Sequence, residues 1–368
     1  MKLLICGDIC PTSDYMELFD NPDKLFNDVI SLFNQSDYLL CNFECPATDH
    51  NKKIVKTGPS LKANPSHVNM LSNIGFNAFS LANNHVLDYG STGLIDTLKY
   101  AKKYNVSVFG AGENCFDAKK PLYIKLKNKT IGFISFAEYE FNIATESTPG
   151  ANLFDPYTSL KDIENARKDC DYLIVLYHGG IEHYKYPSPL LQKKCRAMVD
   201  AGANLVLCQH SHCIGTYETY ENSTILYGQG NCVFGYRKGN KMWNEGLILE
   251  LDIDEEIEIK YHLIKATENG ITLDLSNNRL EEFYSDSNKI LNSQFLKDEF
   301  AKFCKERSAL DLPLFYAKNR VFIKLNRILG GKLFRIKKNN IMITHNLIRC
   351  DAWNELIQEN FKNIFNDN

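Results

Sequence analysis

Residues 3–8 read LLICGD, a short apolar run that ends in the polar side chain of Asp8, and apolar runs that end in Glu, Asn or His follow further along the chain. The later copies are YLLCNFE at 38–44, FSLANNH at 79–85, LIVLYHGG at 173–180 and LVLCQHSH at 205–212. Short runs this rich in apolar residues are typical of strands buried on both faces. In open α/β sheets, side chains that follow the carboxyl ends of such strands meet at one edge. We therefore expect an α/β fold with a polar site at this edge.

Outside these runs the chain alternates between strand and helix signals. Further strands are expected at 106–109, 130–136, 224–227 and 246–253. Helical spacing of apolar residues predicts packing helices at 22–34, 92–104 and 189–201. Alternation of this kind favours a parallel or mixed sheet. The polar stretches at 46–65 and 138–158 are long for loops in a compact domain, and they are expected to line a substrate cleft.

Composition narrows the class of protein. At 368 residues, with 44% hydrophobic and 24% charged residues, the chain is expected to be globular, and no run approaches the roughly 20 apolar residues of a membrane span. A net charge of -3 gives no reason to expect nucleic acid as a partner. The first ten residues lack the pattern of a signal peptide, and the twelve cysteines include no CxxC pair. These features favour a cytoplasmic protein with reduced thiols.

The polar residues at the strand ends have the chemistry of metal ligands. Carboxylate, amide oxygen and imidazole together suit divalent Mn, Fe or Zn, and a carboxylate can bridge two ions. His210 and His212 are two residues apart, so on an extended strand both rings would lie on one face. The candidate site comprises Asp8, Glu44, Asn84, His85, His178, His210 and His212.

The order and wording of these motifs resemble a known family, the CapA-type poly-gamma-glutamate or capsule biosynthesis proteins of the calcineurin-like metallophosphoesterase superfamily. The resemblance covers about residues 1–236. It is carried by CGDICPT, NFECPATD, KTGPSLKANP, SLANNHVLDYG, VFGAGEN, FISFAEYE, HGGIEHYKYPSP, CQHSH and LYGQGNCVFG, in that order. It implies a four-layer α/β/β/α sandwich of mixed sheets.

The resemblance also implies a role for each site residue. Asp8 and His212 would hold a first metal, Glu44 would bridge, and Asn84, His178 and His210 would hold a second. His85 would then be the proton donor to a leaving group, with Asp88 to orient it. Phosphoesterases of this superfamily usually carry Asp-x-His in the first motif, whereas Asp8 is followed by Ile9 and Cys10. Two ions, or one ion held at the second site, both remain open.

Several loop residues are predicted to bind substrate. Lys56 lies in the first long loop, where a cation could meet an anionic group. Glu182, His183 and Tyr184 follow His178, and Asn231 follows a later strand. For each of them, simple loop packing is the competing interpretation.

The chain is expected to divide near residue 265, with a metallophosphoesterase-like domain over 1–265 and a mainly helical, partly basic region over 266–368. From Lys318 to Lys338 this region is basic, with interleaved apolar residues and no acid. Two interpretations are open: a helix that packs on the protein with a solvated basic face, or a peripheral contact with the inner face of an anionic membrane.

These features favour a metal-dependent enzyme of capsule, exopolysaccharide or poly-gamma-glutamate-type surface polymer biosynthesis, acting on a glycan or polyglutamate-like substrate. Its chemistry would be phosphoester hydrolysis or acyl or amide chemistry. One alternative is a general phosphodiesterase or nucleotidase. Another is a non-catalytic subunit of a polymer-assembly complex.

Overall fold

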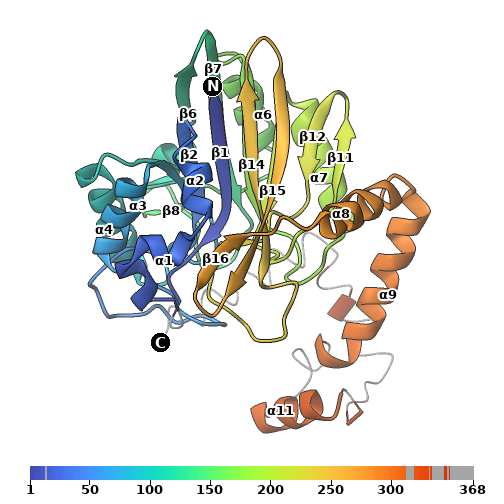
Figure 1. Ribbon diagram of the computed structural model, residues 1–368. Helices are drawn as coiled ribbons and strands as arrows, with labels where there is room; N and C mark the ends of the chain where they lie inside the picture. The colour runs from blue at the N-terminus through green and yellow to red at the C-terminus, as the bar shows by residue number, and fades with distance from the viewer. Residues whose placement is uncertain (13–14, 312–318, 331, 334–343, 346–347, 349–368) are drawn as a thin grey trace. The chain divides into compact units, whose positions relative to one another are not determined.

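A computed structural model describes residues 1–12, 15–311, 319–330, 332–333, 344–345 and 348 (Figure 1). The chain divides into two compact units, Met1–Lys297 and Asp298–Asn368. No helix in the described ranges is both long enough and apolar enough to cross a bilayer. The cysteines in these ranges are free, and most are buried.

Two sheets form the body of the first unit. The first sheet has eight strands in the order β16-β15-β14-β1-β2-β3-β4, with β13 also paired to β1. Strands β1 to β4 are parallel, whereas β14, β15 and β16 extend the sheet in antiparallel fashion. Its strands are β1 (Lys2–Ile9), β2 (Tyr38–Phe43), β3 (Phe76–Ser80), β4 (Ser107–Phe109), β13 (Asn231–Val233), β14 (Glu245–Ile253), β15 (Ile257–Thr267) and β16 (Gly270–Leu273).

The second sheet has six strands in the order β11-β12-β10-β9-β7-β6. Strands β7, β9, β10 and β12 are parallel, and the two edge strands β6 and β11 are antiparallel to their neighbours. Its strands are β6 (Leu122–Leu126), β7 (Lys129–Ala137), β9 (Tyr172–His178), β10 (Leu205–Gln209), β11 (Tyr217–Tyr220) and β12 (Ser223–Leu226). A small separate pair joins β5 (Ala111–Gly112) and β8 (Gly150–Ala151).

The alternation of side chains along the strands creates the layers. In β1, Leu3 and Ile5 pack between the two sheets against Ile174 and Leu207 of the second sheet. Their neighbours Leu4 and Cys6 point the other way, into a separate cluster. Because both faces of the strand are buried, the run reads as continuously apolar. The third cluster lies on the outer face of the second sheet.

Helices cover the two outer faces. The first sheet is covered by α1 (Pro22–Phe26), α2 (Val29–Phe33), α3 (Pro65–Ile74) and α4 (Gly90–Lys103), and the second by α6 (Ser159–Arg167) and α7 (Pro189–Asp200). Two short helices, η1 (Glu17–Asp20) and α5 (Cys115–Ala118), lie in the connections. The predicted four-layer α/β/β/α sandwich of mixed sheets, with the calcineurin-like arrangement, is therefore confirmed.

The helix predicted at 22–34 is wrong in one respect. It is two short helices, because Asn27 between them has φ of 42° and ends α1. Asparagine tolerates this left-handed conformation better than most residues. Its side-chain amide donates to Lys24 O at 2.8 Å and to Ile271 O at 3.1 Å, so the break also ties α1 to β16.

The C-terminal part is helical, as expected: α8 (Asn277–Lys289), α9 (Ser293–Asp311) and α11 (Arg320–Ile328). Strands β15 and β16 continue the first sheet beyond residue 265, and a functional boundary there stays a prediction. In the basic segment, α11 and Gly330 are described, whereas Lys318, Gly331 and 334–338 lie outside the described residues. Contact of this segment with a membrane stays a prediction.

Candidate metal centre

The ends of five strands bring the predicted ligands to one place. Asp8 lies in β1, Glu44 follows β2, His178 ends β9, and His210 and His212 follow β10. Two groups of potential ligand atoms, each within 4.8 Å of one another, share one carboxylate. They are Glu44, His178 and His210, and Asp8, Glu44 and His212. All of these residues are buried.

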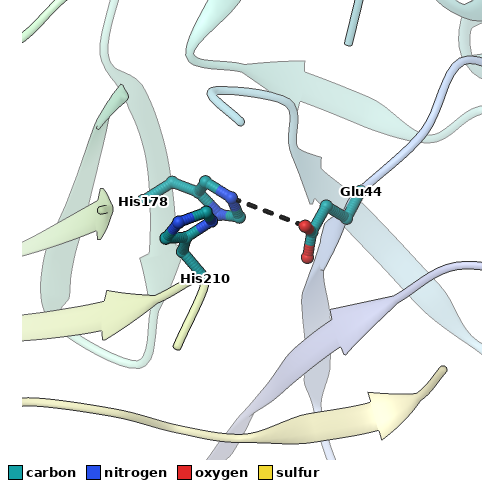
Figure 2. A group of neighbouring side chains, drawn as sticks. All are labelled: Glu44, His178 and His210. Carbon is teal, nitrogen blue, oxygen red and sulfur yellow. Dashed lines mark ion pairs between the residues drawn. The ribbon is translucent and has the colours of Figure 1, made fainter. Parts of the chain in front are cut away.

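The first group is compact. Figure 2 shows the three side chains pointing toward one another, with His178 Nε2 3.6 Å from Glu44 Oε1. The rings of His178 and His210 have centroids 4.9 Å apart. Asn84, which follows β3, places its Oδ1 3.0 Å from His178 Nε2. The predicted amide ligand thus lies beside the same imidazole.

The second group lies against the first through Glu44. His212 Nε2 is 3.9 Å from Glu44 Oε1, and His212 Nδ1 is 3.8 Å from Asp8 Oδ2. Asn231, predicted to bind substrate, places its Oδ1 2.8 Å from His212 Nδ1. An acceptor at this distance can hold one tautomer and one orientation of the ring.

His210 and His212, which follow β10, lie in the site because of a backbone conformation that the sequence pattern did not predict. The extended strand ends at Gln209, and His210 and His212 have φ of 88° and 51°. The interpretation that strand alternation places both rings on one face is therefore wrong, and the positive φ angles of a turn bring them together. Such backbone conformations are costly for residues other than glycine and cluster at functional sites.

The electrostatics of the cluster suit a cation. Burial raises the pKa of Asp8 to about 6, opposed by the hydrogen bond from Asn42. Burial, followed by the charge of Asp8, raises the pKa of Glu44 well above its usual value. Burial and the neighbouring imidazoles lower the pKa values of His178 and His212. Among the residues that the structure describes, no lysine or arginine pairs with Asp8 or Glu44, and the imidazoles favour the neutral form that ligates metals.

Unsatisfied atoms give a direct test of this fit. In the described part of the chain, neither carboxylate oxygen of Glu44 nor Nδ1 of His210 has a hydrogen-bond partner, although all three atoms are buried. Buried polar atoms without partners are rare, and a carboxylate is costly to bury unpaired. A donor set of carboxylates, imidazoles and an amide therefore fits a divalent metal.

His85 and Asp88 form a pair beside the cluster. His85 Nδ1 is 2.6 Å from Asp88 Oδ2, and Lys56 Nζ donates to Asp88 Oδ1 at 2.5 Å. The side chains of Lys56 and Asp88 are 3% and 0% exposed. The backbone N–H of Leu61 also donates to Asp88, at 2.7 Å. The structure thus places Lys56 against Asp88 and His85, and its role as a substrate ligand stays a prediction.

The other predicted substrate residues divide into two groups. Glu182 and His183 line a cavity of about 380 Å³ together with His85 and His212. The ring of Tyr184 instead packs edge-on against Tyr186, at 6.1 Å between centroids. The substrate-binding roles of all three stay predictions.

One residue of the site was missed by sequence reasoning. Asn42 donates to Asp8 Oδ1 at 2.8 Å and lies 3.2 Å from His178 Nδ1, so it contacts one candidate ligand of each group. The signal was present, because Asn42 and Glu44 are two residues apart at the end of one strand and alternation places them on one side. Arg237 and Trp243, which line the cavity, had no comparable signal.

Comparison with known proteins places the chain in a family. Residues 2–236 match the family model described as "Bacterial capsule synthesis protein PGA_cap". The chain is 35% identical over 216 residues to "PGA biosynthesis protein CapA" of Bacillus subtilis (strain 168), covering 58% of this chain and 57% of that protein. It is 31% identical over 245 residues to "Capsule biosynthesis protein CapA" of Bacillus anthracis, covering 64% and 60%.

The chain therefore matches less than two thirds of the length of these relatives. A solved structure described as a novel phosphatase of Mycoplasma pneumoniae aligns with 14% identity and a TM-score of 0.43, over 74% of this chain and 90% of that one. A likeness at this level carries no argument about activity. The family match runs from residue 2 to residue 236 and includes every candidate ligand. On this ground the chain belongs to the PGA_cap family of bacterial capsule synthesis proteins.

Proposed function

We propose that this chain is a metal-dependent enzyme of capsule or poly-gamma-glutamate-type surface polymer biosynthesis. One observation carries the proposal: two overlapping groups of buried donor side chains share Glu44, whose two oxygens accept no hydrogen bond in the described residues. The printed names of the relatives, which refer to PGA and capsule biosynthesis, supply the biological context.

The residues would hold two divalent ions of the Mn, Fe or Zn class. Asp8 and His212 would hold one ion, Asn84, His178 and His210 the other, and Glu44 would bridge them. Ions bound there would supply Lewis acidity, which lowers the pKa of a water and polarises a phosphoryl or carbonyl group.

The chain's own residues would orient the substrate and move a proton. Asp88 engages Nδ1 of His85, which leaves Nε2 as the nitrogen that can exchange a proton with a leaving group. Lys56 and the Leu61 N–H both donate to Asp88, so they hold its carboxylate toward the ring. Because His85 also lines the cavity, a leaving group bound there would lie within reach of this proton.

The test is turnover by the Mn²⁺-loaded protein on p-nitrophenyl phosphate, bis(p-nitrophenyl) phosphate and a γ-linked glutamate oligomer. We expect His85→Gln to keep its metal and to lose turnover by about 10²–10⁴-fold. His210→Ala should lose both metal and turnover. His262→Gln, on β15 and paired with Glu250, is the control and should keep both.

The outcomes separate the proposal from its rivals. Cleavage of the glutamate oligomer, or of one phosphoester with strict selectivity, supports a dedicated biosynthetic enzyme. Rapid turnover of both nitrophenyl esters favours a general phosphodiesterase. Wild-type polymer production by cells carrying His85→Gln would show a non-catalytic subunit and contradict the proposal.

A further inference from the structure

The cavity beside the candidate metal centre has a wall that lies mostly beyond the family motifs. Besides His85 and His212, its lining includes Phe234, Arg237 and Trp243 from the connection between β13 and β14. The family match ends at residue 236, so Arg237 and Trp243 lie beyond it. This wall contains a cation and an aromatic surface next to the residues proposed to act on the substrate.

Arg237 is exposed, and the charge of Glu182, which lines the same cavity, acts on its guanidinium. Its guanidinium carbon lies 3.1 Å from the centroid of the Trp243 ring, which is 3% exposed. No carboxylate among the described residues lies within the 4.0 Å ion-pair distance of its guanidinium. Stacking of this kind fixes the plane of the group and leaves its N–H donors at the edge. These N–H groups can therefore donate hydrogen bonds to an oxyanion in the cavity.

The loop that carries Arg237 is held in place by specific hydrogen bonds. Asn244 accepts from the Arg237 N–H at 2.9 Å and donates to the Arg237 carbonyl at 2.7 Å. Trp243 Nε1 donates to Gly235 O at 3.2 Å. These contacts fix both the backbone of Arg237 and the ring on which it stacks. An arginine held in this way loses little conformational entropy when it binds.

The same loop is tied to the metal site. Asn231 donates from Nδ2 to Trp243 O at 2.9 Å, while its Oδ1 lies 2.8 Å from His212 Nδ1. The rings of Trp243 and His212 also pack together, with centroids 4.7 Å apart. Arg237 thus has a defined position relative to a candidate metal ligand, which is what a substrate-orienting residue needs.

We infer that Arg237, stacked on Trp243, binds an anionic group of the substrate, a carboxylate or a phosphate, and so orients the substrate toward the metal centre. This inference rests on the proposed function and adds a residue that binds and orients the substrate. A guanidinium matches both groups through paired hydrogen bonds. Glu182 lines the same cavity and its charge acts on Arg237, so an anionic group would bind the guanidinium in competition with this acid.

The experiment is calorimetric binding to the Mn²⁺-loaded full chain with two probes, a γ-linked glutamate trimer and glycerol 3-phosphate. Loss of a charge-assisted hydrogen-bond pair predicts that Arg237→Gln weakens binding of at least one probe by about 10-fold or more. Arg237→Lys should weaken binding by an intermediate factor, because lysine keeps the positive charge but lacks the paired N–H donors of the planar guanidinium. Lys238→Gln removes an exposed charge from the same loop outside the cavity lining, and should change binding by less than about 2-fold.

The probe that depends on Arg237 identifies the anion as carboxylate or phosphate. Equal weakening by Arg237→Gln and Lys238→Gln, or no binding of either probe to the wild type, would overturn the inference. Turnover of the same samples keeps the two proposals apart. Binding that depends on Arg237, without turnover, would contradict the proposed enzymatic activity but not the anion site. Turnover together with unchanged binding in Arg237→Gln would contradict the anion site alone.

Discussion

Glu44 is the residue on which both groups of donor side chains converge. It is 0% exposed, and burial together with the charge of Asp8 raises its pKa. A buried acid with two unsatisfied oxygens reduces stability unless a cation or proton meets it. The three histidines around it have lowered pKa values, so they do not supply that charge. At this scale a divalent metal is the partner that accounts for the arrangement.

Asn42 gives a test of how the ligands are held. It contacts Asp8 and His178, and groups that orient metal ligands typically contribute about 10–100-fold to metal affinity. We expect Asn42→Ala to weaken Mn²⁺ binding by about that factor in a competition titration. Asn77→Ala is the control, because Asn77 accepts from Leu39 N on the same sheet at a distance from the site. Equal affinities of Asn42→Ala and wild type would contradict the assignment.

Lys56 gives a test of the buried pair beside His85. Replacing it with Met removes the lysine partner of the buried Asp88, and breaking a buried ion pair from one side costs about 3–5 kcal/mol. The prediction is a loss of that order in the free energy of unfolding in urea. Lys53→Met removes an exposed lysine from the same loop and should change it by less than about 0.5 kcal/mol. Similar losses in both variants would show that the pair is not a stabilising contact.

Sequence reasoning could locate most of the candidate ligands because each one ends an apolar run. It could not foresee the turn that carries His210 and His212, since the local pattern there is that of a strand and the positive φ angles arise from contacts made after folding. One such contact is the His210 N–H donating to Asp8 Oδ2 at 3.2 Å, between residues far apart in the chain.

The connection between β13 and β14 shows the limit of motif reasoning at the scale of elements. The motif LYGQGNCVFG, which leads into the connection, was recognisable from the sequence. The position of Arg237 and Trp243 instead depends on which strand follows the connection in the sheet. The parallel pairing of β13 with β1 and the antiparallel pairing of β14 with β1 together place this connection at the metal site. The break of the predicted helix at Asn27 has a similar origin, because the carbonyl of Ile271 that it satisfies belongs to a distant strand.

The close approach of Gly7 in β1 to Gly230, just before β13, supplies a test at this scale. A Cβ on Gly7 would lie 2.2 Å from the carbonyl oxygen of Gly230, so a side chain there must push the two segments apart. We expect Gly7→Ala to cost more than about 2 kcal/mol of folding free energy and to reduce metal content, because Asp8 is the next residue.

Gly58→Ala separates this crowding from backbone effects. Gly58 has φ of 78° but no atom within 4 Å of the added Cβ. Its replacement should cost only about 1 kcal/mol, which is the cost of the left-handed conformation. Urea unfolding measures both variants. If Gly7→Ala lost no more folding free energy than Gly58→Ala, the close approach of Gly7 to the Gly230 carbonyl would be contradicted.

At the scale of the whole molecule, the predicted apolar runs all became strands, and the two-sheet sandwich follows from their burial on both faces. Three of the missed strands, β5, β8 and β13, have only two or three residues. The other four, β6, β11, β15 and β16, lie at or near sheet edges. Their half-exposed residues carry the weaker alternating pattern, so they gave no clear signal. The order of strands within each sheet depends on long-range pairing, which no local pattern encodes.

The central claim is that the edge where these strands end holds a divalent metal. The most direct measurement is anomalous X-ray scattering at the Mn edge from crystals of the Mn²⁺-loaded protein. The account predicts one peak among Glu44, His178 and His210 and a second among Asp8, Glu44 and His212, about 3.5–4 Å apart. A single peak at the first group would reduce the centre to one ion. No peak at either group, in protein saturated with Mn²⁺, would contradict the account.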